Sequence, residues 1–131
     1  MYQTIRNSHF DLTYHLVLVT KYRHPVIKDD LAEDLKSYTL RYFSNNKAEV
    51  YEYNDDRDHI HILFAGRPNM NLSHFVNGLK TNSSRYIRKE YASTLESYYC
   101  KPYFWSNSYF IGTVSEQSHA SVKRYIKNQK E

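Results

Sequence analysis

The sequence contains very little of the residues that cross-link a chain or make it flexible. Cys100 is its one cysteine, which excludes an intramolecular disulfide and a zinc site built from several thiolates of one chain. Three glycines and three prolines argue against long linkers. No apolar run is long enough to span a membrane, and the polar start lacks a signal-peptide pattern. These absences predict one globular domain over residues 1–131, in a reducing cytoplasmic setting.

Positive charge and tyrosine are what the chain has instead. The formal net charge is +4 and the pI is about 9.1, which permits a polyanionic partner without requiring one. Fourteen tyrosines are present, and their flat rings are suited to stacking on unpaired bases. Ordinary packing explains most of them, so composition points towards nucleic acid without establishing it.

Spacing of the apolar residues predicts an alternation of strands and helices. Strands are expected at 10–20, 48–54, 58–64 and 108–114, and helices at 30–45, 71–91 and 118–131. Asp30 and Glu33 fit a capping box at the first helix, and the segment 92–107 is predicted to be irregular. This order predicts an α+β protein with a ferredoxin-like (split βαβ) antiparallel sheet. Two helices would cover one face, and an extra C-terminal helix would carry Tyr125.

The strand DHIHILF (58–64) raises the question of chemistry. Successive side chains of a strand point to opposite faces, so His59 and His61 share one face, while Ile60, Ile62 and Phe64 share the other. Adjacent neutral imidazoles can ligate a divalent metal, although a tight site needs a third ligand. Hydrogen-bonded or solvated histidine pairs are commoner than metal sites, so both interpretations stay open at this point.

The predicted C-terminal helix offers that third ligand. Val122, Tyr125, Ile126 and Gln129 follow i, i+3, i+4, i+7 spacing and share a face. If that face meets the sheet, the Gln129 amide oxygen can reach a metal and Tyr125 can direct its phenol to the same place. Packing for Tyr125 and solvation for Gln129 are the ordinary alternatives.

Five blocks of the sequence, in order, resemble the single-tyrosine HUH transposases, the small enzymes of bacterial and archaeal insertion sequences that move single-stranded DNA. They are YHLVLVTKYRHPV (14–26), DHIHILF (58–64), LKTNSSRYIRKE (79–90), FWSNSYFIGTV (104–114) and VKRYIKNQ (122–129). HUH denotes His-hydrophobic-His, which His59-Ile60-His61 matches. The blocks cover nearly the whole chain from Tyr14 to Gln129.

The resemblance implies a DNA transesterase. Its YIxxQ block makes Tyr125 the nucleophile, and it makes His59, His61 and Gln129 the metal ligands. It implies Mg²⁺, whereas imidazole and amide ligands alone lean towards Mn²⁺ or Zn²⁺. It also implies recognition of single-stranded DNA hairpins by a homodimer whose active site is shared between subunits. The predicted DNA-binding residues are Lys21, Arg23, Lys80, Arg85, Arg88 and Lys89.

Four other interpretations compete with this one. Another HUH nuclease, such as a replication initiator or relaxase, fits the small size and the YIxxQ helix less well. A non-catalytic, RRM-like single-strand binder shares the split βαβ sheet, but SYFIGTV (108–114) lacks the RNP1 pattern. A zinc hydrolase lacks support because there is no HExxH. A domesticated relative acting on palindromic host repeats would have the same residues.

Overall fold

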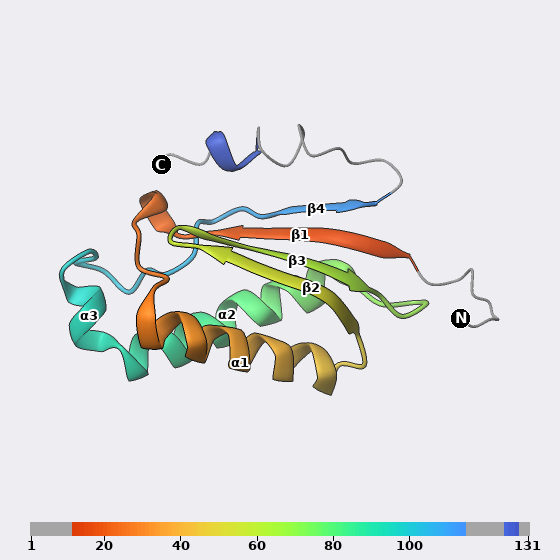
Figure 1. Cartoon of the computed structure of the whole chain (residues 1–131), viewed down its shortest axis with the longest axis horizontal. Helices are drawn as coiled ribbons and strands as arrows, with labels where there is room; N and C mark the ends of the chain where they lie inside the picture. Colours follow the sequence, from red (N-terminus) through yellow and green to blue (C-terminus); the bar gives the residue numbers. More distant parts are fainter. Residues whose placement is uncertain (1–11, 115–124, 129–131) are drawn as a thin grey trace.

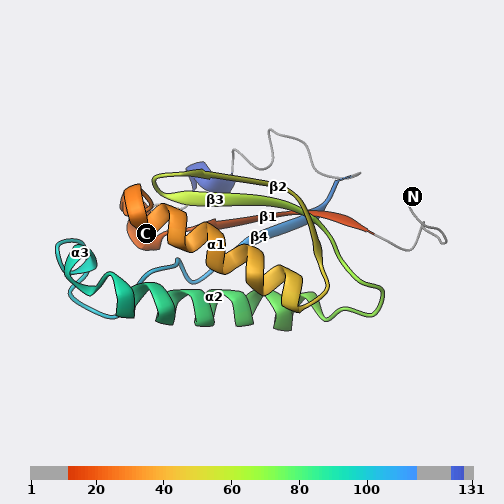
Figure 2. The same cartoon turned by 60° about the horizontal axis from the view of Figure 1, so that its bottom comes forward.

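The structure, a computed structural model, describes residues 12–114 and 125–128 (Figure 1). Within these residues, four strands form one antiparallel sheet with two long helices against one face (Figures 1 and 2). The elements are β1 (Thr13–Val19), η2 (Lys21–Arg23, a 3-10 turn), α1 (Asp29–Asn45), β2 (Glu49–Asp56), β3 (His59–Ala65), α2 (Leu72–Glu90), α3 (Ala92–Glu96) and β4 (Phe110–Thr113). The predicted α+β architecture with two helices on one sheet face is confirmed.

The strand order is β2-β3-β1-β4, which puts β3 and β1 at the centre of the sheet. They pair antiparallel, with Val17 opposite His61 and Val19 opposite His59. The consecutive apolar residues of β1 are completely buried from Leu16 to Val19, so side chains on both faces of this strand are covered. A continuous apolar run is typical of a strand buried on both sides. The second face of β1 therefore needs a cover other than α1 and α2.

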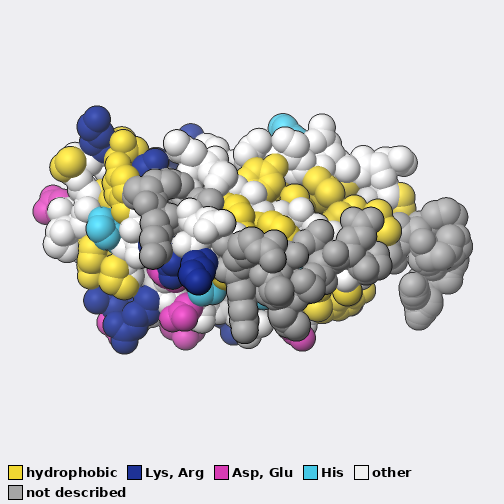
Figure 3. Space-filling model, turned by 90° about the horizontal axis from the view of Figure 1, so that it is seen from above, with side chains coloured by type: hydrophobic (Ala, Val, Ile, Leu, Met, Phe, Trp, Pro, Cys, Tyr) yellow, Lys and Arg dark blue, Asp and Glu magenta, His cyan; other side chains and the backbone are white. Residues whose placement is uncertain are grey.

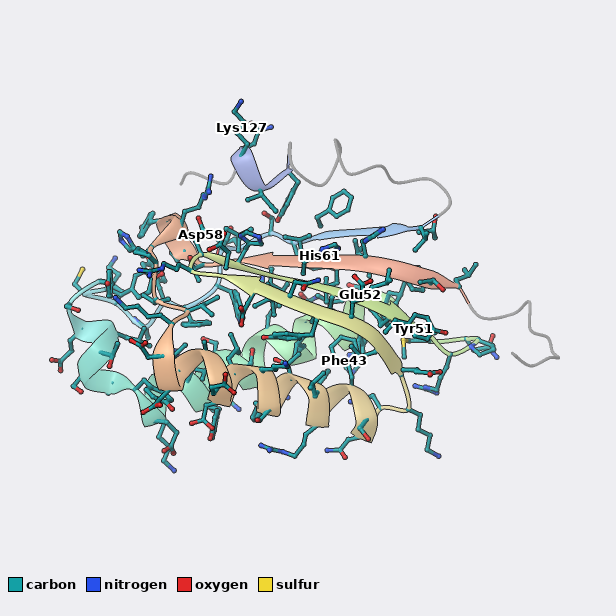
Figure 4. All side chains as sticks on the ribbon, in the orientation of Figure 1. Phe43, Tyr51, Glu52, Asp58, His61 and Lys127 are labelled. Atoms are coloured by element: carbon teal, nitrogen blue, oxygen red, sulfur yellow. The ribbon has the colours of Figure 1, made fainter. Side chains whose placement is uncertain are left out.

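The hydrophobic core lies between the sheet and the two helices. Ile60, Ile62 and Phe64 of β3 are 0% exposed. The Phe64 ring meets Phe43 of α1 edge-on at 5.0 Å between centroids and lies 5.8 Å from Phe75 of α2. Figure 4 shows Phe43 between α1 and the sheet. Burial of each such side chain is worth about 1.5–3 kcal/mol, so the alternate positions of β3 hold the helices in place, as the spacing predicts.

The helix boundaries differ from prediction in two places. α1 begins at Asp29 with Lys28 as N-cap and no side-chain cap bond, so the capping box predicted at Asp30 is wrong. Asp29 and Asp30 instead place two carboxylates in the first turn, where the helix dipole favours them. The segment 92–107, predicted to be irregular, contains α3. Among the described residues no helix has both the length and the apolar character needed to cross a membrane.

Candidate active site

The sheet face opposite α1 and α2 carries the histidines. His59 and His61 are partly exposed at alternate positions of β3, while Ile60 between them and Ile62 after them are buried in the core. The turn before β3 places Asp58 beside the first histidine, and Figure 4 shows Asp58 and His61 along this part of the sheet. Polar side chains thus occupy the face that the core does not use.

His59 is held by an ion-pair network. Its Nδ1–H donates to Asp58 Oδ1 at 2.8 Å. Arg23, from η2, contacts the other carboxylate oxygen through Nε and Nη2, each at 2.8 Å. Burial raises the pKa of the Asp58 carboxyl, but hydrogen bonds and charges from His59 and Arg23 outweigh it and bring this pKa below its ordinary value. The ionised carboxylate orients the ring and directs Nε2 of His59 away from the network.

His61 is oriented by a different partner, His15 of β1. His15 Nδ1 lies 2.8 Å from His61 Nε2, and the two rings stack with centroids 5.0 Å apart. One nitrogen must donate and the other accept, so this contact selects a tautomer for each ring. Each histidine of the HUH pair therefore has one ring nitrogen engaged with a named partner, which is how proteins commonly fix the imidazoles that bind metals.

The donor chemistry fits a divalent cation. Two oriented imidazoles on neighbouring positions of one face supply nitrogen ligands, and a third donor is required. Within residues 12–114 and 125–128, no group of three His, Cys, Asp or Glu side chains is placed to hold a metal. The predicted third ligand, Gln129, lies outside the described residues, as does Val122.

Tyr125 lies over the same sheet face. Residues 125–127 are helical, and Tyr125 and Ile126 pack against the cluster of Val17 and Val19. The Tyr125 ring also lies 5.5 Å from the Phe110 ring. These two valines are the cross-strand neighbours of His61 and His59. The Tyr125 hydroxyl lies 3.1 Å from Ser108 Oγ. The short helix thus covers the second face of β1 and brings the phenol to the strand beside the histidine pair.

The predicted DNA-binding residues fall into distinct environments. Lys21 is buried, with Nζ over the rings of Tyr22 and Tyr103, and Arg23 pairs with Asp58. Lys80 Nζ donates to the carbonyls of Ser106 and Ser108, and Arg88 Nε donates to Ser84 Oγ. Arg85 and Lys89 are exposed on α2. On the face in Figure 3, Lys and Arg side chains gather in the left half.

Three residues of this site escaped sequence reasoning. His15 and Ser108 contact His61 and Tyr125 from 46 and 17 positions away, and neither belongs to the HUH or YIxxQ pattern. Asp58 directly precedes the histidine pair, and the sequence predicts no role for it beyond the start of the strand 58–64. Its sequence signal was its position next to His59, because a carboxylate beside an imidazole is a common orienting partner.

Comparisons with known proteins show the family to which the chain is related. The family described as "Transposase IS200 like" matches residues 8–129. The ISDra2 transposase TnpA of Deinococcus radiodurans is 33% identical over 120 residues, covering 92% of this chain and 85% of that protein. The transposase for insertion sequence element IS200 of Salmonella typhimurium is 26% identical over 129 residues, covering 98% and 84%.

A solved structure shows the same fold. The crystal structure described as that of a transposase from Deinococcus radiodurans R1 superposes with a TM-score of 0.86. It is 31% identical in sequence, and the match covers 98% of each chain. The family match spans nearly the whole chain and includes the strand with both histidines and the helix with the tyrosine. The chain therefore belongs to the IS200-like transposase family, the single-tyrosine HUH DNA transesterases.

Proposed function

We propose that this enzyme cuts and rejoins single-stranded DNA through a 5′-phosphotyrosine on Tyr125, with a divalent metal, at element ends marked by hairpins. The observation that carries the proposal is the packing of Tyr125 on Val17 and Val19, directly beside the strand that carries His59 and His61. Val17 and Val19 pair with His61 and His59 across the sheet, and this supports a site in which the nucleophile and the candidate metal ligands act on one phosphate. The family assignment supports the reaction class.

The transesterification keeps the energy of the broken bond. The Tyr125 hydroxyl oxygen attacks the scissile phosphorus, the bond to the 3′ oxygen breaks, and the leaving strand takes a proton to become a 3′ hydroxyl. The phosphodiester is replaced by a phosphotyrosine ester of similar energy, so no ATP is consumed. A second 3′ hydroxyl reverses the step and joins new ends. The Ser108 hydroxyl, 3.1 Å from the phenol oxygen, is placed to orient it.

His59, His61 and Gln129 would hold the cation. Mg²⁺, with Mn²⁺ as the alternative, would supply a Lewis acid at the non-bridging oxygens of the scissile phosphate. The protein's own contribution is orientation: Asp58 fixes the ring of His59, and His15 fixes the ring of His61. These contacts reduce the side-chain freedom that each ligand would lose on binding.

Basic side chains would hold the DNA. We assign phosphate contacts to Lys21, Arg23, Lys80, Arg85, Arg88 and Lys89. Lys21 and Arg23 also have structural contacts, with aromatic rings and with Asp58 respectively. Substituting either one therefore changes the site as well as the charge, so Arg85 and Lys89, which are exposed, are the cleaner probes of phosphate binding.

Incubation with hairpin-bearing single-stranded DNA and Mg²⁺ or Mn²⁺ tests the proposal. We expect a covalent complex on a denaturing gel that retains a label on the 5′-phosphate side of the break and releases the other strand with a 3′ hydroxyl. Peptide mass spectrometry should place the nucleotide on Tyr125, and EDTA should prevent its formation. DNA binding without any covalent complex would refute the enzymatic mechanism.

The shared active site of a homodimer needs its own test. We propose that the C-terminal helix of one subunit can complete the site of its partner. In the described structure Tyr125 packs on its own sheet, so both arrangements need comparison. In a mixture of Tyr125→Phe and His61→Ala subunits, each mixed dimer has one intact site if the helix acts on the partner. It has none if each subunit uses its own helix, and inactivity of that mixture would refute the shared site.

A further inference from the structure

A hollow of about 330 Å³ lies between α2, from Lys80 to Arg88, and the segment 102–107, and none of its lining residues belongs to the histidine site. Lys80, Ser84 and Arg88 line it from the helix, and Tyr103, Trp105 and Asn107 line it from the returning chain. Figure 2 shows this chain running from α3 past α2 towards β4. The volume is at the lower end of the range for small-molecule sites, about 300–1,000 Å³, so a single nucleotide is an occupant of suitable size.

The charge of the hollow favours an anion. Its lining contains two cations, Lys80 and Arg88, and no carboxylate. Arg88 is braced by the 3.1 Å bond from Nε to Ser84 Oγ, which uses one of the five N–H donors of a guanidinium. Lys80 is braced by its 2.7 Å bond to the Ser106 carbonyl. Eight residues separate the two cations along α2, a rise of about 12 Å, so they border the hollow at two points along its length.

An aromatic ring borders the same space. Tyr103 also lines a neighbouring hollow of about 220 Å³, which shares Arg88 with the first and has a more apolar lining. Its ring is held in place by edge contacts with Tyr22 and Tyr99 and by Lys21 Nζ, 5.0 Å from the ring centroid. A braced aromatic ring beside cationic groups is the combination that binds single-stranded nucleic acid without sequence readout.

A series of contacts connects the wall of the hollow with the proposed nucleophile. The Lys80 ammonium on its wall donates to the carbonyls of Ser106 and Ser108, at 2.7 and 3.4 Å. The side chain of Ser108 is the group that contacts the Tyr125 hydroxyl, at 3.1 Å. Ser106 lines the hollow and Ser108 contacts Tyr125, so a strand bound at Tyr125 would reach the hollow by passing around the segment 106–108.

We propose that this hollow binds one unpaired nucleotide next to the cleaved phosphodiester, with its base on Tyr103 and its phosphate between Lys80 and Arg88. The inference rests on the proposed function because Tyr125 defines where the cleaved bond lies. It adds a specific role for two of the six basic residues, Lys80 and Arg88, and for a tyrosine outside the sequence motifs. Arg85 and Lys89, on the same helix, do not line the hollow.

A fluorescent base analogue locates the bound nucleotide. The probe is a hairpin-bearing single-stranded oligonucleotide with 2-aminopurine at one position at a time on either side of the cleavage site, in EDTA so that no cleavage occurs. We expect strong quenching at one unpaired position beside the cleavage site, because stacking on an aromatic ring quenches this base. Tyr103→Ala should restore the fluorescence, and Tyr103→Phe, which keeps the ring face, should retain the quenching.

Affinity and its salt dependence test the phosphate contact. Arg88→Ala should weaken binding of the oligonucleotide about tenfold and reduce the slope of log K against log salt by about 0.7. Arg41→Ala is the matched control, since Arg41 is an exposed arginine of α1 to which no function is assigned. A blunt hairpin without unpaired extensions should bind Arg88→Ala and wild type equally. Circular dichroism melting of each variant shows whether the fold is retained.

Two outcomes overturn the inference. One is quenching that is the same in wild type and in folded Tyr103→Ala at every position. The other is an affinity loss in Arg41→Ala equal to that in Arg88→Ala. Covalent complex formation with Mg²⁺ on the same DNA keeps the two proposals apart. If wild type forms the complex and either outcome is found, the proposed nucleotide site in the hollow is refuted and the transposase mechanism stands. Position-specific quenching without any covalent complex supports nucleotide binding in the hollow and refutes the phosphotyrosine mechanism.

Discussion

The two faces of the sheet use the same strands for opposite purposes. On the helix face, Ile60, Ile62 and Phe64 are fully buried in an apolar core. On the other face, His59 and His61 stay partly exposed and contact Asp58 and His15. A strand alternates its side chains between faces, so the buried core and the candidate metal-binding face are separated by a single position along β3. Substitutions at neighbouring residues should therefore have very different consequences.

The largest expected effect is on the chemical face. Tyr125→Phe should abolish the covalent DNA complex, because it removes the attacking oxygen, and in another covalent enzyme loss of the nucleophile cost on the order of 10⁶ in rate. The phenyl ring keeps its packing on Val17, Val19 and Phe110, so hairpin binding and thermal stability should stay at wild-type levels. The measurement is a denaturing-gel assay with labelled DNA. A persistent covalent complex would place the nucleophile elsewhere.

The next effect belongs to the buried face. Phe64→Ala should lower the free energy of unfolding by about 3–5 kcal/mol, because it leaves a cavity between β3, Phe43 and Phe75. His61→Ala, on the opposite face of the same strand, should cost about 1 kcal/mol, the net value of its hydrogen bond to His15. Urea unfolding followed by circular dichroism measures both. Equal losses of unfolding free energy in the two variants would show that the histidine face contributes as much to stability as the apolar core.

The third effect concerns Asp58, which orients His59 without itself being a predicted metal ligand. Asp58→Asn should weaken Mn²⁺ binding by about 10–100-fold, since the orienting partner of His59 becomes neutral and the imidazole loses its fixed tautomer. Isothermal titration calorimetry in the absence of DNA measures this directly. Asp55→Asn is the control, because it removes an equal charge from an exposed position of β2 that pairs with Ile60 rather than with His59. An equal loss of Mn²⁺ affinity in both variants would show that the effect comes from the lost charge and not from the orientation of His59.

The smallest effect is on acid stability. The folded-state pKa of Asp58 lies below the ordinary carboxyl value of 3.8, so the unfolded chain binds its proton at a higher pH than the folded chain does. The stabilisation from this carboxylate is therefore present above about pH 4–5 and is lost as the pH falls through the lowered pKa. Because Asp58 is partly exposed, the difference in unfolding free energy between wild type and Asp58→Asn should be under about 1 kcal/mol at pH 7. It should shrink below pH 4, and a constant difference from pH 7 to pH 3 would exclude this linkage.

Much of the fold was predictable because local spacing carried it. The alternation in DHIHILF predicted which residues of β3 face the helices, and helical spacing located α1 and α2 to within two residues at the ends observed. The capping box at Asp30 failed because the backbone begins its helix one residue earlier, at a position that no side chain caps. The match to the IS200-like family also decides against the RRM-like binder, which the strand order by itself left open.

The sequence by itself determined that His59 and His61 share one face of β3, and it predicted the nucleophile and the metal ligands, since the His-x-His period and the helical period of the YIxxQ block are local properties. Only the tertiary structure decided their partners. His15 reaches His61 across 46 residues and Arg23 reaches Asp58 across 35, because antiparallel pairing of β1 with β3 brings these distant segments together. The hollow beside α2 likewise exists only because residues 102–107 return along that helix. Contacts of this kind depend on chain topology, which no local pattern in the sequence records.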